Sequence, residues 1–232
     1  INAGGGGNNR NILINGGMNV AQRGTSSADT SATGYYTVDR WQLVNLNTAA
    51  TITITQENDT PTGFGKSTKL ACTAVDTSVA TDEVIKFRQK IEGRRLFSFA
   101  KGTSSAKPFA VSFYVKGNTT ATYACELFDQ ENTRSMTQLF NVTTDWTRIE
   151  LTFPADTTGT LSFDNQSRFQ IQFALHAGSN FTSGTLNSSA FASSTDANRY
   201  GGISSFVDST SRTFFITGVQ LEVGQNPTSF EH

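Results

Sequence analysis

The sequence predicts an all-β protein built as a two-sheet antiparallel β-sandwich. Thr, Ser and Asn are abundant and Phe occurs 18 times in 232 residues, a mixture that suits half-buried strands and polar turns. Apolar and polar residues alternate with a period of two in many segments, as expected for strands with one solvent-facing side. No apolar stripe of comparable length has the helical spacing. A sandwich of this length commonly folds as one domain.

The N-terminal half is predicted to contain five strands and one short helical turn. In Thr51–Thr55 two isoleucines alternate with threonines, and in Glu83–Ile91 three apolar residues alternate with basic ones, so each segment has one face for a core. Gly93–Lys101 is predicted to form a short turn of helix. The five strands are expected over Asn11–Asn15, Thr37–Val44, Thr51–Thr55, Lys69–Ala74 and Glu83–Ile91.

The C-terminal half is predicted to contain six further strands. Arg168–Leu175 has the clearest pattern, with aromatic and aliphatic residues at odd positions and Arg or Gln opposite them. Each such side chain contributes roughly 1.5–3 kcal/mol on burial. Trp41 and Trp146 are both assigned to the core. The strands are expected over Phe109–Val115, Tyr123–Leu127, Met136–Val142, Ile149–Phe153, Arg168–Leu175 and Thr213–Val223.

The domain organisation is expected to be simple. Residues 1–10 are rich in Gly and Asn and are predicted to form a flexible linker from a preceding module, or a disordered terminus without a role. Residues 11–232 form the single sandwich domain. The chain opens with Ile1 and a glycine tract, which suggests a piece of a longer protein. No apolar run is long enough for membrane insertion.

The charge balance argues against nucleic acid as a partner. Lys and Arg number 18 against 19 Asp and Glu, a net charge of −1, so no overall basic field is available to hold a phosphate backbone. Locally, the segment 86–107 has seven cations against Glu92. This segment is either an attractive patch for acidic polysaccharide or a solvated strand face that pairs with acidic residues of a neighbouring subunit. The cations are Lys86, Arg88, Lys90, Arg94, Arg95, Lys101 and Lys107.

Several motifs resemble a known family. The first part of the chain contains Asn11–Asn19 (NILINGGMN), Ala21–Gly24 (AQRG) and Val38–Trp41 (VDRW). Later motifs follow in the same order: Gln89–Gly93 (QKIEG), Lys107–Lys116 (KPFAVSFYVK), Phe215–Gly224 (FITGVQLEVG) and the closing Phe230–His232. Together they resemble the distal domain of bacteriophage tail fibres and related virion proteins, over about Asn11 to His232.

This resemblance implies an attachment domain on the external surface of a virion, on a tail fibre or as a capsid decoration. Such domains are often homotrimers and contact host cell-surface glycans and other virion proteins. Two alternatives remain open. The first is a structural virion protein, a head decoration or fibre assembly element without ligand binding. The second is a polysaccharide depolymerase.

The two ends of the domain also resemble jelly-roll carbohydrate-binding modules. Such modules begin with Leu/Ile-x-Asn-Gly and end with Val-x-Leu-Glu, as at Leu13–Gly16 and Val219–Glu222. The resemblance implies that the first and last strands pair. The resemblance also implies a candidate site for a structural calcium ion, formed by Glu222 and backbone oxygens near Asn15. However, Thr217 and Gly218 stand where an acidic pair often precedes the last strand, so we expect no metal or other cofactor.

The candidate ligand site lies on an unusually long connection, Ala177–Ser211. A loop of this length is usually functional or disordered, and its spaced aromatic residues argue against disorder. Glycan binding requires aromatic faces for sugar C–H groups and polar side chains for hydroxyls. The alternative is that these aromatic residues only anchor the loop. The candidate ligand-binding residues are Phe181, Phe191, Asn198, Arg199 and Tyr200, with Tyr35 and Tyr36 from an earlier turn.

Catalysis is not expected. No spacing singles out a pair of carboxylates for glycosidase chemistry, so we assign no catalytic residues. His176 follows a predicted strand and is expected to make a structural hydrogen bond. Cys72 and Cys125 fall on inward stripes and are expected to be buried free thiols, with a disulfide as the alternative.

Overall fold

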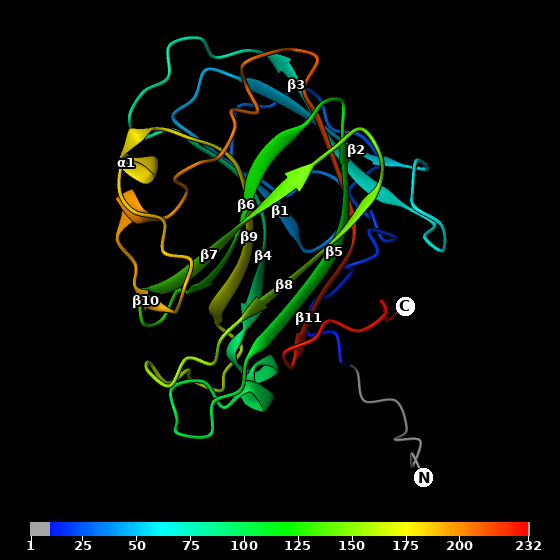
Figure 1. Cartoon of the computed structure of the whole chain (residues 1–232). Helices are drawn as coiled ribbons and strands as arrows, with labels where there is room; N and C mark the ends of the chain where they lie inside the picture. Colours follow the sequence, from blue (N-terminus) through cyan, green and yellow to red (C-terminus); the bar gives the residue numbers. More distant parts are fainter. Residues whose placement is uncertain (1–9, 232) are drawn as a thin grey trace.

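The computed structural model describes residues 10–231, which form two antiparallel sheets packed face to face (Figure 1). The six-stranded sheet has the order β1 (Trp41–Leu46), β4 (Val84–Glu92), β9 (Ser167–Ala177), β6 (Ala121–Asp129), β7 (Arg134–Val142), β10 (Ala192–Ser193). The five-stranded sheet has the order β2 (Thr51–Glu57), β3 (Ser67–Ala74), β11 (Thr213–Val223), β5 (Phe109–Gly117), β8 (Thr147–Phe153). The predicted all-β jelly-roll sandwich is confirmed. Of the predicted linker, residues 1–9 lie outside the described residues.

Every predicted strand except Asn11–Asn15 overlaps a strand of the structure, but Thr37–Val44 does so only from Trp41 onward, because residues 37–40 form a turn. That segment does lie beside β11, because Ile12 N–H donates to Leu221 O at 2.8 Å. Side chains satisfy its other backbone groups: Leu13 N–H donates to Asn11 Oδ1 at 3.1 Å, and Ile14 N–H donates to Gln89 Oε1 at 2.9 Å. These side-chain partners replace the ladder that a strand needs.

The two ends of the described chain meet at the same edge of the sandwich. The carboxylate of Glu231 accepts the N–H groups of Arg10 and Asn11, at 2.7 and 3.1 Å. Glu231 N–H in turn donates to Gln220 Oε1 at 2.9 Å. The first and last described residues are thereby fastened to each other and to β11.

Short helices occur at two places. The predicted turn over Gly93–Lys101 is confirmed as two 3₁₀ segments, η1 (Gly93–Arg95) and η2 (Phe97–Phe99). The long connection contains α1 (Ser179–Thr182), η3 (Asp196–Asn198) and β10, none of which the sequence predicted. No helix in the described part of the chain is long and apolar enough to cross a membrane.

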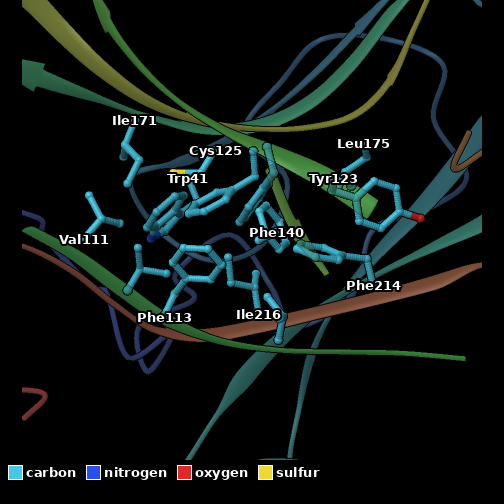
Figure 2. Packing of buried hydrophobic residues seen from close by; sticks show 14 of the residues in the cluster. Trp41, Val111, Phe113, Tyr123, Cys125, Phe140, Ile171, Leu175, Phe214 and Ile216 are labelled. Carbon is cyan, nitrogen blue, oxygen red and sulfur yellow. The ribbon is translucent and has the colours of Figure 1, made fainter. Parts of the chain in front are cut away.

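The core between the sheets contains many aromatic rings among aliphatic side chains (Figure 2). Trp41 stacks on Phe87 with ring centroids 5.2 Å apart, and Phe113 meets Phe173 edge-on at 4.9 Å. Such pairs add stabilisation beyond the area that they bury. Cys72 and Cys125 are both buried free thiols, as predicted. Burial raises the pKa of Cys72 to about 11.

The assignment of Trp146 to the core is wrong. Trp146 precedes β8, whose inward residues occupy the odd positions from 149 to 153, so position 146 points outward. Its indole N–H donates to Asp59 Oδ1 at 2.9 Å on the outer surface of the five-stranded sheet. Trp41 is 1% exposed and belongs to the core as predicted.

Candidate functional site

The outward face of the six-stranded sheet has a layer of long polar side chains. The strand register places Gln42, Arg88, Gln172, Glu126 and Thr137 in one row across β1, β4, β9, β6 and β7. Arg88 links this row to the next row of outward side chains, which contains Gln170. Its Nε donates to Gln42 Oε1 at 2.9 Å, and its Nη1 donates to Gln170 Oε1 at 3.0 Å. This face therefore offers charged and amide groups rather than an apolar surface.

The long connection covers one half of this face. Arg199 donates to both oxygens of Glu126, and the hydroxyl of Tyr200 donates to Glu126 Oε2 at 2.7 Å. The Lys86 ammonium lies beneath the same ring, 3.5 Å from the Tyr200 oxygen. Burial, reinforced by the positive charge of Arg199, lowers the pKa of Lys86 to about 7. These contacts hold the connection against its own sheet.

The structure buries three of the five predicted ligand-binding residues of this connection. Tyr200 is 0% exposed, and Arg199 is buried in its ion pair with Glu126. Phe191 belongs to the core, where it packs on Phe109 at 5.5 Å. Phe181 is half-buried and packs near Tyr200 at 6.3 Å. In this arrangement the buried rings have no open face for a sugar, which favours the anchoring interpretation.

Asn198 and Tyr36 also have structural contacts. The main-chain carbonyl of Asn198 accepts the N–H of Asn187 at 2.9 Å within the connection. The hydroxyl of Tyr36 donates to Ala32 O and lies 2.7 Å from Thr30 Oγ1, and the residue packs against the core. Tyr35, its neighbour, is the one predicted residue with an exposed ring, at 39%.

Tyr35 lies in a hollow at the uncovered half of the same face. The hollow has a volume of about 520 Å³ and lies between the segment that precedes β1, the end of β4 and the beginning of β9. We call it the Tyr35 hollow. Its lining residues are Gln22, Arg23, Tyr35, Asp39, Arg40, Lys90, Glu92, Asn165 and Ser167.

Ion pairs fix four of the five charged groups of the Tyr35 hollow. Arg23 Nη1 lies 3.2 Å from Asp39 Oδ1, and its guanidinium lies over the Tyr35 ring at 5.7 Å. Arg40 Nη2 lies 2.5 Å from Glu92 Oε1. Burial alone would raise the pKa of Glu92, but the Arg40 hydrogen bond and charge hold it below its ordinary value. Burial lowers the pKa of Lys90.

This arrangement offers the kinds of group that bind a hydroxyl-rich ligand. An aromatic ring offers its face to C–H groups, and guanidinium, carboxylate and amide groups around it match hydroxyls. The geometry therefore favours recognition of a hydroxyl-rich ligand.

Sequence reasoning missed most of the Tyr35 hollow, although its motifs contained the signal. Gln22 and Arg23 belong to the AQRG motif, Asp39 and Arg40 to VDRW, and Lys90 and Glu92 to QKIEG. All three motifs are among those that resemble the tail-fibre family. Because β1 and β4 are neighbours in the sheet, motifs about fifty residues apart in the chain meet at one place.

The segment 86–107 does not form one basic patch. Lys86 is buried under the connection, and Lys101 is buried beside Asp129 and Asp156. Arg95 donates to Ile12 O at 2.9 Å, whereas Lys107 is exposed. The cations are dispersed, and several have partners within the same chain.

Two further expectations concern His176 and Glu222. His176 Nδ1 lies 3.0 Å from Ser205 Oγ and Nε2 lies 3.0 Å from Glu83 Oε2, so the predicted structural hydrogen bond is confirmed. The Glu222 carboxylate accepts the N–H and the hydroxyl of Thr228 and the amide of Gln220. Among residues 10–231, no group of three or more His, Cys, Asp and Glu side chains is arranged to hold a metal ion.

Comparison with known proteins gives similarity to solved structures alone. No protein-family model and no curated protein matches the sequence. The tailspike protein 4 enzymatically active domain of bacteriophage CBA120 is similar over 93% of this chain, with 16% identity and a TM-score of 0.47; this chain spans only 22% of that chain.

Carbohydrate-binding modules are similar at comparable levels. TmCBM61, solved with β-1,4-galactotriose, has 10% identity and a TM-score of 0.47, covering 93% of this chain and 99% of that one. A family 11 module of Clostridium thermocellum has 12% identity and a TM-score of 0.42, covering 85% and 95%. We draw no functional argument from similarities of this size.

Proposed function

We propose that the chain is a non-enzymatic attachment domain of a virion surface protein, such as a tail fibre, and that it binds a host cell-surface glycan in the Tyr35 hollow. One observation carries the proposal. Three motifs that resemble the tail-fibre family meet around an exposed tyrosine ring and supply six of the residues that line the hollow.

The chemistry of the hollow supports a sugar ligand. Tyr35 offers a ring face, while Asn165, Gln22 and the two ion pairs offer donors and acceptors around it. Because Arg23 is paired with Asp39 and Arg40 with Glu92, hydroxyl groups can bind without leaving these four charges buried and isolated. Assembly as a homotrimer with other virion proteins would present three such hollows together, which raises avidity without new contacts.

The test is binding of the Tyr35→Ala variant to a panel of bacterial surface glycans, compared with the wild-type protein. We expect loss of the ring to weaken binding about tenfold, the upper range for one aromatic contact. Phe97→Ala is the matched control, because Phe97 is 68% exposed and lies outside the lining of the hollow. Thermal unfolding of both variants shows that the fold is retained. Equal binding by all three proteins, or binding of no glycan, would refute the proposal.

The non-enzymatic part of the proposal has its own test. Because Glu92 is held ionised beside Arg40, we expect no release of reducing ends when the protein is incubated with a polysaccharide that it binds. Release of reducing ends that disappears in Glu92→Gln would instead establish a depolymerase. A particle reconstruction with the Tyr35 hollow buried between subunits would favour a purely structural role.

A further inference from the structure

The outward face of the five-stranded sheet has a row of alternating cations and aromatic rings. The register places Lys69 of β3, Phe215 of β11 and Lys116 of β5 side by side, and Trp146 follows at the start of β8. Lys69 Nζ lies 5.6 Å and Lys116 Nζ 4.9 Å from the Phe215 ring centroid. Lys116 also lies 5.6 Å from the Trp146 centroid. We call these four residues the aromatic row.

Asp59 fixes one end of the aromatic row. Its carboxylate accepts the Trp146 indole N–H at 2.9 Å and pairs with Lys116. The Lys116 and Trp146 hydrogen bonds hold the pKa of Asp59 below its ordinary value. The indole therefore has a defined orientation, and the charge of Lys116 is offset.

The positive charge of Lys69, unlike that of Lys116, is not balanced by a paired carboxylate among the described residues. No carboxylate of residues 10–231 forms an ion pair with Lys69, which acts on Asp59 only through a weaker, longer-range charge interaction. Its ammonium stands beside the partly exposed ring of Phe215. The aromatic row thus has one uncompensated positive charge, and an anionic group is its natural complement.

Further aromatic residues extend this surface along the strands. Tyr114 is two residues before Lys116 on β5 and faces the same way. The Phe64 ring lies 5.1 Å from Tyr114 and 5.1 Å from Phe230. Gly218, with φ of +62°, permits this approach, because a Cβ there would lie 2.7 Å from the Phe64 ring. The face therefore offers ring surfaces over more than one row.

We propose that this face is a second ligand-binding surface, which takes an acidic polysaccharide of the uronate type. Sugar rings lie with their C–H groups on Phe215 and Trp146, and a sugar carboxylate pairs with Lys69. The proposal is independent of the Tyr35 hollow, which lies on the outer face of the other sheet. It adds a different ligand chemistry at a different place.

Trp146 supplies a direct readout, because the chain has two tryptophans and Trp41 is 1% exposed. The protein is titrated with oligogalacturonate, alginate and hyaluronate fragments while tryptophan emission is recorded. We expect a saturable shift that weakens as salt is added. Carboxyl-reduced oligogalacturonate should give no shift, and Trp146→Phe should lose the signal.

Charge variants test the role of Lys69. Lys69→Glu should weaken binding about fivefold, as expected for one exposed ionic contact, and Lys69→Arg should keep it. Lys107→Glu is the matched control, since Lys107 is an exposed lysine outside the aromatic row. Tyr35→Ala should leave the Trp146 response unchanged. The experiment therefore distinguishes failure of this proposal from failure of the proposed glycan binding in the Tyr35 hollow.

Three results would overturn the inference. The first is no Trp146 shift with any of the three acidic chains. The second is equal binding of the native and carboxyl-reduced oligogalacturonate, or of the wild-type and Lys69→Glu proteins. The third is an emission shift that follows protein concentration without polysaccharide, together with self-association in sedimentation, which would make this face a subunit interface.

Discussion

Arg199 and Glu126 form a two-pronged ion pair, with Arg199 Nε 2.8 Å from Oε1 and Nη2 2.7 Å from Oε2. Burial alone would raise the pKa of Glu126, but the Arg199 charge and hydrogen bonds hold it below its ordinary value. The pair joins the long connection to the centre of the six-stranded sheet. It is one of several contacts that hold the connection over this face.

Removal of Arg199 should destabilise the protein strongly. Arg199→Ala leaves the Glu126 carboxylate buried without its partner, which typically costs about 3–5 kcal/mol. Arg199→Lys should also lose stability, because an ammonium group cannot form the two parallel hydrogen bonds that the guanidinium makes with Glu126. Urea unfolding at neutral pH measures both effects. The control is Arg212→Ala, whose pair with the 45% exposed Asp208 should contribute about 1 kcal/mol or less; equal losses at both sites would contradict the prediction.

Lys86 should make stability rise with pH. Its pKa is about 7 in the folded protein and 10.5 ordinarily, so between these values the unfolded chain binds a proton that the folded chain lacks. Stability therefore increases from pH 7 towards pH 10.5. Lys86→Met should stabilise the protein most below pH 7, with the gain shrinking at higher pH. Chemical unfolding at several pH values measures this, with exposed Lys107→Met as control; a gain independent of pH would show that Lys86 is not the cause.

A buried lysine at one end of the sandwich occupies a cage of oxygens. Lys101 Nζ donates to Thr158 O at 3.0 Å and Gly159 O at 2.8 Å. It also pairs with Asp156 at 3.1 Å and with Asp129, and both carboxylates are buried. The ammonium thus supplies the positive charge that these oxygens require.

Lys101→Ala should lose about 3–5 kcal/mol of unfolding free energy, because two buried carboxylates lose a shared partner. Carboxylate and carbonyl oxygens are the ligands that Ca²⁺ prefers. Millimolar calcium should therefore raise the melting temperature of Lys101→Ala and leave the wild type unchanged. Lys107→Ala provides the comparison with an exposed lysine. If calcium shifts all three proteins alike, the cage does not bind it.

Gly16 should not tolerate a side chain. A Cβ at this position would lie 2.1 Å from the carbonyl oxygen of Val219, which accepts the Asn11 amide. Gly16→Ala must move the N-terminal segment away from β11, at a cost of roughly 1–3 kcal/mol. Thermal unfolding measures the loss. Gly65→Ala, whose Cβ would meet only Asn19 Oδ1 at 3.5 Å, should be close to neutral, and similar losses in the two variants would contradict the steric argument.

The strands were predictable because one face of each sheet is buried, which imposes alternation along the chain. In β9 the alternation is one of residue type: Phe169 to Leu175 point inward at every second position, although the residues between them are buried too. The outward position of Trp146 was also readable from the phase of β8, although the prediction placed it inside. The segment Asn11–Asn15 could not be read this way, because its partners are the side chains of Asn11 and Gln89.

The candidate site was predictable only in part. Tyr35 was expected to bind ligand and does line the hollow, but its companions come from strands that meet only in the sheet. The burial of Tyr200 could not be foreseen, because its partner Glu126 lies 74 residues away on the outward side of β6. The alternation along β6 identifies Glu126 as outward-facing. Its burial arises only because the long connection folds over it.

Because Arg10 and Glu231 are in contact, the chain ends could be moved to another place without changing how the strands are arranged in space. A short glycine linker from residue 231 to residue 10 would close the polypeptide into a ring. New ends could then be opened at the exposed turn 103–105. Such a circular permutant should keep the sandwich.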